Sequence, residues 1–211
     1  MTVRKLDPDG MELWVQEYDN PDRHGADVAD VVLTDGSGDI YLVGDTEVSA
    51  TEVQGFVRKY DTDGNELWTQ MLQDVIMTNG TLDADDNVVL TGAVNPDNWN
   101  IWVAKYDPEL TQISTSSNDG PSGNTDIGYA VAVGPSGDAY VSGYVTVVGE
   151  QSEIWAGRWM SDLGLRLWSD SYGNMDSHLA DEARGIAVSD DESRVAVVGF
   201  ESVIGQDTNV W

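Results

Sequence analysis

A short phrase recurs along this chain and restricts its fold more than any other feature. The copies are VRKLDPDGMELW at 3–14, VRKYDTDGNELW at 57–68, VAKYDPELTQI at 103–113 and AGRWMSDLGLRLW at 156–168. A repeat of about fifty residues is typical of propellers and solenoids, in which each unit buries its apolar face against the next unit. We therefore expect one structural unit per period, stacked on its neighbours.

Pairs of short apolar runs alternate with this phrase and predict β-hairpins. They are rich in β-branched and aliphatic residues and are bounded by Gly, Asp, Ser and Asn, as strands usually are. Asp and Gly also fill the connections, where tight turns need capping or a positive φ. Each period therefore predicts one four-stranded antiparallel blade, and the chain should be all-β. The pairs are DVVLTD (30–35) with DIYLVG (39–44), VIMTNGTLD (75–83) with NVVLTG (87–92), AVAVGP (130–135) with DAYVSG (138–143), and GIAVSD (185–190) with RVAVVG (194–199).

The apolar pattern also predicts how the strands of a blade are arranged. The first strand is apolar at almost every position, which favours an inner strand buried on both faces. The third strand alternates, with Phe56, Arg58 and Tyr60 on one face, and is expected to lie further out and half exposed. A large ring that recurs at a strand end is expected to pack against the next blade. The residues at this end are Trp14, Trp68, Ile113 and Trp168.

These phrases resemble the SBBP-type bacterial β-propeller repeat family, whose units join an inner hairpin to a segment such as VAKYDPDGNELW. The resemblance covers nearly the whole chain. The Asp, Gly and Trp of YDTDGNELW at 60–68 are also similar to the tryptophan-docking repeats of quinoprotein-like propellers. The SBBP resemblance implies a scaffold protein, exported to the exterior or the cell surface of a bacterium, without an assigned activity.

The repeat boundaries predict about four blades, of which the first and last are split. We expect one propeller domain over 1–211, as a monomer or completed by further blades. Joining DTNVW at the end to TVRKLD at the start regenerates a normal outer hairpin. Two structures therefore remain open: a ring closed by a shared blade, which removes exposed edges, or a segment of a longer propeller. The units are 3–29 (partial), 30–74, 75–129, 130–184 and 185–211 (partial).

Charge and composition exclude several classes of function. The chain has 38 acidic and 10 basic residues, a net charge of −28, and no cysteine. Such a surface repels nucleic acids and anionic membranes, which bind through clustered Lys and Arg. No stretch is apolar for long enough to insert into a bilayer, and the N-terminus lacks the apolar core of a signal peptide. Disulfides and thiolate chemistry are excluded as well.

The loops that enter the inner strands supply the candidate metal ligands. DRHGADVAD at 22–30 and DSHLADEAR at 176–184 share one pattern, and NTDIGYA at 124–130 keeps its Asp. Carboxylates around a channel mouth suit a hard cation, so Ca²⁺ is the expected cofactor if there is one. Alternatively, each Asp bonds the backbone of its own loop. The candidate metal ligands are Asp27, Asp126 and Asp181, and the candidate ligand-binding residues beside them are His24 and His178.

A second resemblance to calcium loops is weaker. DTDGNE at 61–66 matches the start of an EF-hand loop, but the twelfth position from Asp61 is Leu72 in place of the bidentate Glu. The segment is better explained as a turn that its Asp caps.

No catalytic signature accompanies these loops. The chain has no GxSxG turn, and two histidines in equivalent loops resemble duplicated structure more than a catalytic base. The sequence therefore favours a non-enzymatic extracellular scaffold that binds a protein or a carbohydrate. The alternative is a hydrolase or lyase with its active site at the channel mouth. Trp99, in the polar loop at 94–100, is a candidate ligand contact, with packing onto Trp102 as the alternative.

Overall fold

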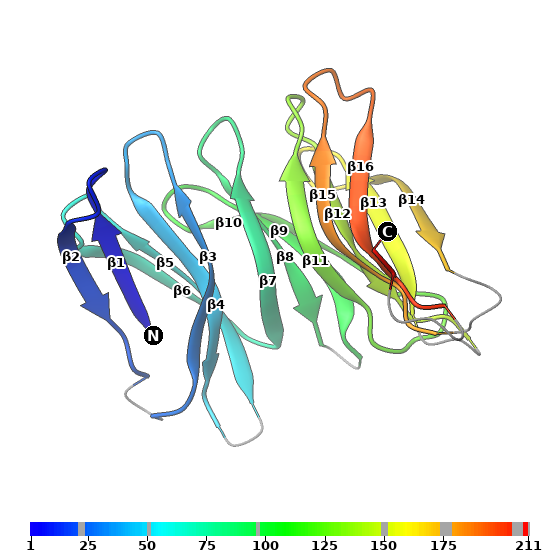
Figure 1. Ribbon diagram of the computed structural model, residues 1–211, viewed down its shortest axis with the longest axis horizontal. Helices are drawn as coiled ribbons and strands as arrows, with labels where there is room; N and C mark the ends of the chain where they lie inside the picture. The colour runs from blue at the N-terminus through cyan, green and yellow to red at the C-terminus, as the bar shows by residue number, and fades with distance from the viewer. Residues whose placement is uncertain are drawn as a thin grey trace. The chain divides into compact units, whose positions relative to one another are not determined.

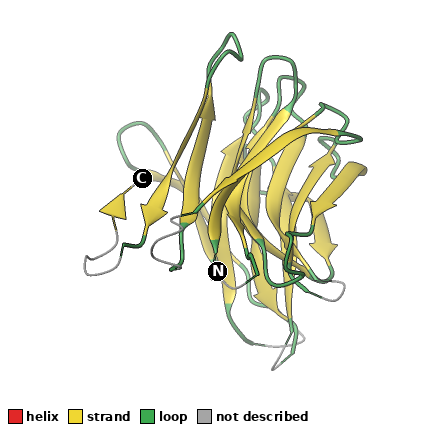
Figure 2. Ribbon diagram, turned by 90° about the vertical axis from the view of Figure 1, so that its right-hand side faces the viewer, coloured by secondary structure: helices red, strands yellow, loops and turns green. Residues whose placement is uncertain are grey.

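The computed structural model describes residues 1–20, 24–49, 52–95, 98–148, 152–173, 179–203 and 209–210. This part of the chain consists of strands joined by turns and loops and contains no helix (Figure 2). Accordingly, none of its segments is a helix that could cross a membrane. The predicted all-β class is confirmed. The chain divides into two compact units, residues 1–77 and 78–211, which are described in turn.

The first unit contains a hairpin followed by a four-stranded antiparallel sheet (Figure 1). In the sheet, each strand pairs with the next in the chain, in the order β3-β4-β5-β6. The strands are β1 (Thr2–Leu6) and β2 (Glu12–Glu17) in the hairpin, and β3 (Asp27–Thr34), β4 (Ile40–Glu47), β5 (Val53–Tyr60) and β6 (Glu66–Leu72) in the sheet.

The second unit repeats the same meander, with β7 beginning in the first unit (Figure 1). Two sheets have four strands, and a third has three. The strands are β7 (Val75–Leu82), β8 (Val88–Val94), β9 (Asn100–Tyr106) and β10 (Gln112–Asn118); β11 (Ile127–Val133), β12 (Ala139–Val145), β13 (Glu153–Trp159) and β14 (Arg166–Tyr172); and β15 (Glu182–Val188), β16 (Val195–Glu201) and β17 (Asn209–Val210). Four-stranded antiparallel units are thus confirmed, as is a third strand beginning at Asn209.

Within each unit, consecutive sheets pack face to face. In the first unit, Ile40 and Phe56 of the sheet form a core against which Met1, Val3 and Trp14 of the hairpin pack. In the second unit, Val89 and Ile101 of β7–β10 join one core with residues of the following sheet, Val141, Trp155 and Leu163 among them. Burial of this apolar surface on both sides of each interface stabilises the stack.

The burial of the strands corrects one expectation from the sequence. The second strands β4, β8 and β12 are buried almost throughout, and β5 is buried from Gly55 onward. The first strand β3 is largely exposed, and Val32 keeps 63% of its surface accessible. The predictions of a fully buried first strand and a half-exposed third strand were therefore wrong for this sheet. In the second unit, the first strand β11 packs against β8 and β15 of neighbouring sheets and buries Ala130 and Val131. The burial of a first strand therefore depends on the sheets that pack on its faces, which the apolar pattern does not record.

Aspartates cap the repeated turns as the sequence predicted. In the DTDGN turn, Asp61 Oδ1 accepts hydrogen bonds from the backbone N–H groups of Asp63 at 2.9 Å and Asn65 at 2.8 Å. Hydrogen bonds of this kind stabilise turns by satisfying backbone donors locally. The resemblance to a calcium loop is thus explained by turn capping. The same double acceptance occurs at Asp7, Asp35, Asp83 and Asp107.

The repeated tryptophan docks on the next sheet in the first unit. Trp14 packs against Gly64, its ring centroid lies 6.3 Å from that of Tyr60, and its Nε1–H donates to the Thr62 carbonyl at 3.1 Å. The predicted packing is confirmed for this copy. In the last copy, Trp168 instead contacts Tyr140 of its own sheet.

Strand register corrects the assignment of this position in the third copy. Trp14, Trp68 and Trp168 lie opposite the basic residue of the third strand, and Ser114 occupies this position opposite Lys105. Ile113 falls in a bulge between Gln112 and Ser114 and is not the equivalent of the tryptophans. The same bulge occurs in every copy, where it contains Leu13, Leu67 and Leu167. Ile113 corresponds to these leucines, so the assignment from the sequence was one residue out.

Candidate functional site

The three predicted metal ligands are hydrogen-bonded within their own sheets. In the first unit, Asp27 accepts hydrogen bonds from the Thr46 hydroxyl and from the N–H of Asn20, the latter at 3.1 Å. Asp181 in the second unit accepts the N–H of Ser202 at 2.8 Å. Each carboxylate thereby ties the start of a first strand, or the loop before it, to the end of the second strand or the residue that follows it.

Asp126 makes the same connection and is fully buried. Its two oxygens accept the N–H of Thr146 at 2.7 Å and the N–H of Gly120 at 2.5 Å. Burial raises the pKa of Asp126, while these two backbone donors act in the opposite direction. In the described ranges, no three acidic or imidazole side chains gather as a metal ion would need. Asp126 and Asp181 thus accept backbone N–H groups, as the alternative reading of the sequence expected, and the assignment of the three aspartates as metal ligands stays a prediction.

The candidate ligand-binding residues lie in different surroundings. His24 is exposed, and its Nδ1 lies 2.6 Å from Asp19 Oδ2. Trp99 is half-buried, and its carbonyl accepts the N–H of Asp126 at 2.6 Å, so the structure brings these two predicted residues together. His178 lies outside the described residues.

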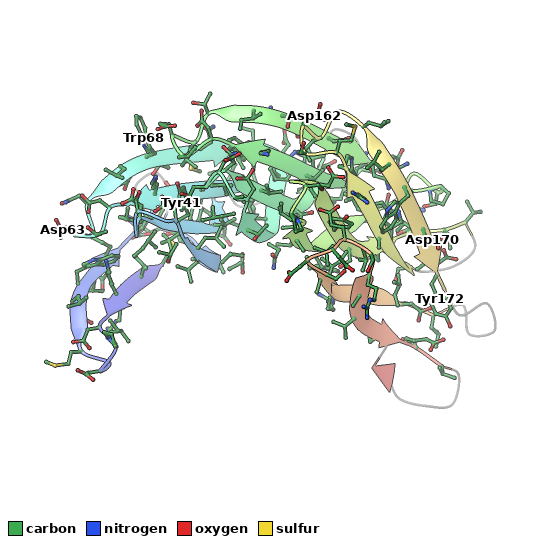
Figure 3. All side chains as sticks on the ribbon, turned by 90° about the horizontal axis from the view of Figure 1, so that it is seen from above. Tyr41, Asp63, Trp68, Asp162, Asp170 and Tyr172 are labelled. Atoms are coloured by element: carbon green, nitrogen blue, oxygen red, sulfur yellow. The ribbon has the colours of Figure 1, made fainter. Side chains whose placement is uncertain are left out.

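A hollow of about 410 Å³ lies beside the loop that Asp126 holds. We call it the Asn118 pocket. Its lining comes from residues 118–121 at the end of β10, from Val145 and Trp155, and from Arg166 and residues 169–171 on β14. Figure 3 shows Asp170 and Tyr172 along this last strand. The volume lies within the range of small-molecule sites, about 300–1,000 Å³.

The Asn118 side chain is the most informative group in this pocket. It is 9% exposed, yet within the described residues its amide has no hydrogen-bond partner. Its amide atoms are not among the fully buried polar atoms that lack a partner, so they remain accessible from the pocket. The amide is therefore available to a molecule that enters the pocket.

Arg166 is the second unusual group. It is exposed and forms no ion pair within the part of the chain that the structure describes. By contrast, Arg58 pairs with Glu66 at 3.0 Å, and Arg158 pairs with Asp138 at 2.8 Å. In a chain with a net charge of −28, a guanidinium left without a carboxylate partner beside an open pocket is free to bind a ligand.

Comparison of equivalent positions explains why this pocket is open. Strand register places Asn118 where the other copies have larger side chains. In the first unit, the guanidinium of Arg58 lies 3.5 Å from the ring centroid of Tyr18 and pairs with Glu66, so protein groups occupy this place. A smaller hollow of about 290 Å³ remains beside them. In the second unit, Asn118 takes the position of Tyr18, Gly157 that of Arg58, and Arg166 that of Glu66. In the two remaining fourth strands, the position of Tyr18 is taken by Leu72 and Tyr172.

Sequence reasoning missed Asn118 and Arg166. The signal was present, because TSSN at 115–118 is polar where the other fourth strands end in Tyr or Leu. Recognising it required placing Ser114, and not Ile113, opposite the basic residue of the third strand.

Comparisons with known proteins establish the fold and no more. No protein-family model matches the chain, and no curated protein is similar to it. Among solved structures, the chain is similar to a crystal structure of a protein of unknown function from Bacteroides caccae. The TM-score is 0.57 at 12% sequence identity, and the match covers 100% of this chain and 68% of the other. The resemblance to SBBP-type repeats stays a prediction.

Proposed function

We propose that this chain is a non-enzymatic β-propeller scaffold that binds a glycan or a protein in the Asn118 pocket. The observation that carries the proposal is the buried Asn118 amide, which lacks a protein partner in the described structure. Sites of binding combine a shaped hollow with a few polar groups that fix the ligand, and this pocket has both. The resemblance to exported bacterial repeats supports a location outside the cell or at its surface.

The chemistry of the lining favours binding over hydrolysis. A serine nucleophile needs an adjacent base, and the described residues that line the pocket include no histidine. The Ser171 hydroxyl already donates to Glu153 at 2.7 Å. The loop aspartates proposed for the channel mouth are likewise occupied with backbone donors, so no observation favours the hydrolase or lyase alternative.

A variant that restores the side chain of the other repeats tests the proposal. Asn118→Tyr should fill the pocket, because Tyr18 and Tyr172 occupy the same register position. A panel of oligosaccharides and peptides should include a compound that raises the Tm of the wild type and not that of this variant. Ile113→Tyr is the matched control, since it adds the same ring to an exposed site on the same segment. If no compound raises the Tm of the wild type, or if each compound raises the Tm of the wild type and of Asn118→Tyr equally, the proposal is contradicted.

We also propose that these antiparallel sheets are blades of a β-propeller, about four of them in this chain. The repeated meander supports this proposal, since each complete sheet pairs its four strands in chain order.

A further inference from the structure

Three groups of the Asn118 pocket offer hydrogen bonds in matching pairs. The Arg166 guanidinium presents parallel donors and the Asn118 amide presents one donor group and one acceptor. The Asp170 carboxylate presents acceptors too, although its Oδ1 also accepts the Ser171 N–H at 3.0 Å. Arg166 forms no ion pair with Asp170 or with any other described carboxylate, so the donors and acceptors are not consumed by each other. Hydroxyl groups on adjacent carbons both donate and accept, and such a pair suits all three groups.

Trp155 supplies an apolar wall to the same pocket. Its side chain is 4% exposed and its ring centroid lies 5.7 Å from that of Trp159, so the indole is held firmly. A Cβ at Gly157 would come within 2.5 Å of the Trp155 ring. Gly157 takes the register position that Arg58 has in the first unit, and its lack of a side chain leaves space for the Trp155 indole. A wall of this kind suits the C–H face of a sugar ring.

The charges of the protein and of the pocket lining restrict which ligands can bind. The net charge of −28, together with Asp119 and Asp170 in the lining, disfavours anions such as uronic acids. Arg166 offsets one of these two carboxylates, and an apolar ligand would leave the Asn118 amide and the carboxylates desolvated without partners. An uncharged molecule dense in hydroxyl groups satisfies all of these conditions.

We infer that the Asn118 pocket binds an uncharged pyranose unit of a glycan through a pair of neighbouring hydroxyl groups. Asn118, Arg166 and Asp170 bind the hydroxyls, and Trp155 packs against the ring. The inference rests on the proposed binding function and names its ligand.

Titration calorimetry with neutral oligosaccharides of glucose, galactose, mannose and N-acetylglucosamine tests the inference. At least one should bind the wild type, and its uronic-acid counterpart should bind more weakly. Periodate, which cleaves carbon–carbon bonds between adjacent hydroxyls, should abolish binding of the treated sugar. Arg166→Gln should weaken binding about tenfold, the effect of losing one hydrogen bond to a charged group. Asn118→Tyr should abolish binding, and Ile113→Tyr should leave it unchanged.

The possible results distinguish an error in the inferred ligand from an error in the proposed binding site. A peptide that binds the wild type and not Asn118→Tyr would retain the binding function and overturn the sugar. Stronger binding of uronic acids, or equal binding after periodate treatment, would overturn the uncharged diol. Glycan binding unchanged in both Asn118→Tyr and Arg166→Gln would place the sugar elsewhere and overturn both proposals. If Asn118→Tyr fails to fold, the exposed Arg166→Gln decides by itself.

Discussion

The indole of Trp14 lies against the backbone of Gly64, so closely that an added Cβ would come within 2.9 Å of the Trp14 ring. This contact explains two conserved features of the repeated phrase together, its tryptophan and its turn glycine. Where the turn residue is instead Leu163, with φ of 56° and a buried side chain, the position of the preceding tryptophan is occupied by Ser114. The large residue is thus on the strand in the first unit (Trp14 against Gly64) and in the turn in the second unit (Leu163, with Ser114 on the strand).

Substitution of this glycine should measure the tryptophan contact. Gly64 and Gly10 occupy the same turn position with φ of 87° and 83°, but nothing lies within 4 Å of a Cβ at Gly10. Gly10→Ala should cost about 1 kcal/mol of unfolding free energy, from the left-handed backbone alone. Gly64→Ala should cost about 1–3 kcal/mol more, because the ring must shift. Urea denaturation gives both values, and equal losses would show that Trp14 docking contributes nothing measurable.

Glu192 links two sheets of the second unit across a strained turn. Its carboxylate accepts hydrogen bonds from Ser136 N–H at 2.7 Å and Arg158 at 2.8 Å, although its φ of 52° is one that glycine adopts in the equivalent turns. Hydrogen bonding by Ser136 lowers the pKa of Glu192. Glu192→Gln should destabilise the fold by about 1 kcal/mol, since the charge is lost and the strain is kept.

Two comparisons check this assignment. Glu192→Gly should lose the same link but regain part of the stability by relieving the backbone strain. The difference between wild type and Glu192→Gln should shrink in about 1 M salt, where screening weakens partly exposed ion pairs. A glutamine variant as stable as the wild type in low salt would show that the link is not stabilising.

Asp45 should make stability depend on pH. Burial raises the pKa of this carboxyl to about 6, although it accepts the N–H of Met77. Because the folded pKa exceeds the unfolded one, the folded state binds the proton more tightly, and stability falls as pH rises from about 4 to about 6. Asp45→Asn, neutral at all pH values, should raise the unfolding free energy by about 1–2 kcal/mol at neutral pH and little at about pH 4.

The control for Asp45 is an exposed carboxylate. Asp63→Asn removes one negative charge from an exposed turn position and so reports the general relief of repulsion. Chemical denaturation of both variants at the two pH values isolates the local effect. An Asp45→Asn gain that is no larger than that of Asp63→Asn, or that does not vary with pH, would contradict the burial argument.

Calcium should leave the stability unchanged. Asp126 and Asp181 already hold backbone donors, and binding a cation would require giving these up. Melting curves in excess Ca²⁺ and in excess chelator should coincide. Asp126→Asn should lower the Tm equally in both, because the amide accepts through only one of its atoms. A Ca²⁺-dependent rise in Tm that this variant abolishes would restore the metal site predicted from the sequence.

The sequence by itself determined the period, the strands and the turns. These depend on residues close together in the chain: an Asp that caps the N–H groups two and four residues onward, a glycine at positive φ, and apolar runs of strand length. Interactions of this range leave a readable pattern in any single copy, and repetition reinforces it.

Only the tertiary structure decided which strands are buried, which residues are equivalent and where the pocket lies. Val32 looks like a core residue in sequence but keeps 63% of its surface exposed, and Ser114 takes the position that tryptophan has in the other copies. The Asn118 pocket combines β10, β13 and β14, and its openness depends on the side chains at Asn118 and Gly157 together. The volume left between two packed sheets depends on residues far apart in the chain, so no local pattern records it.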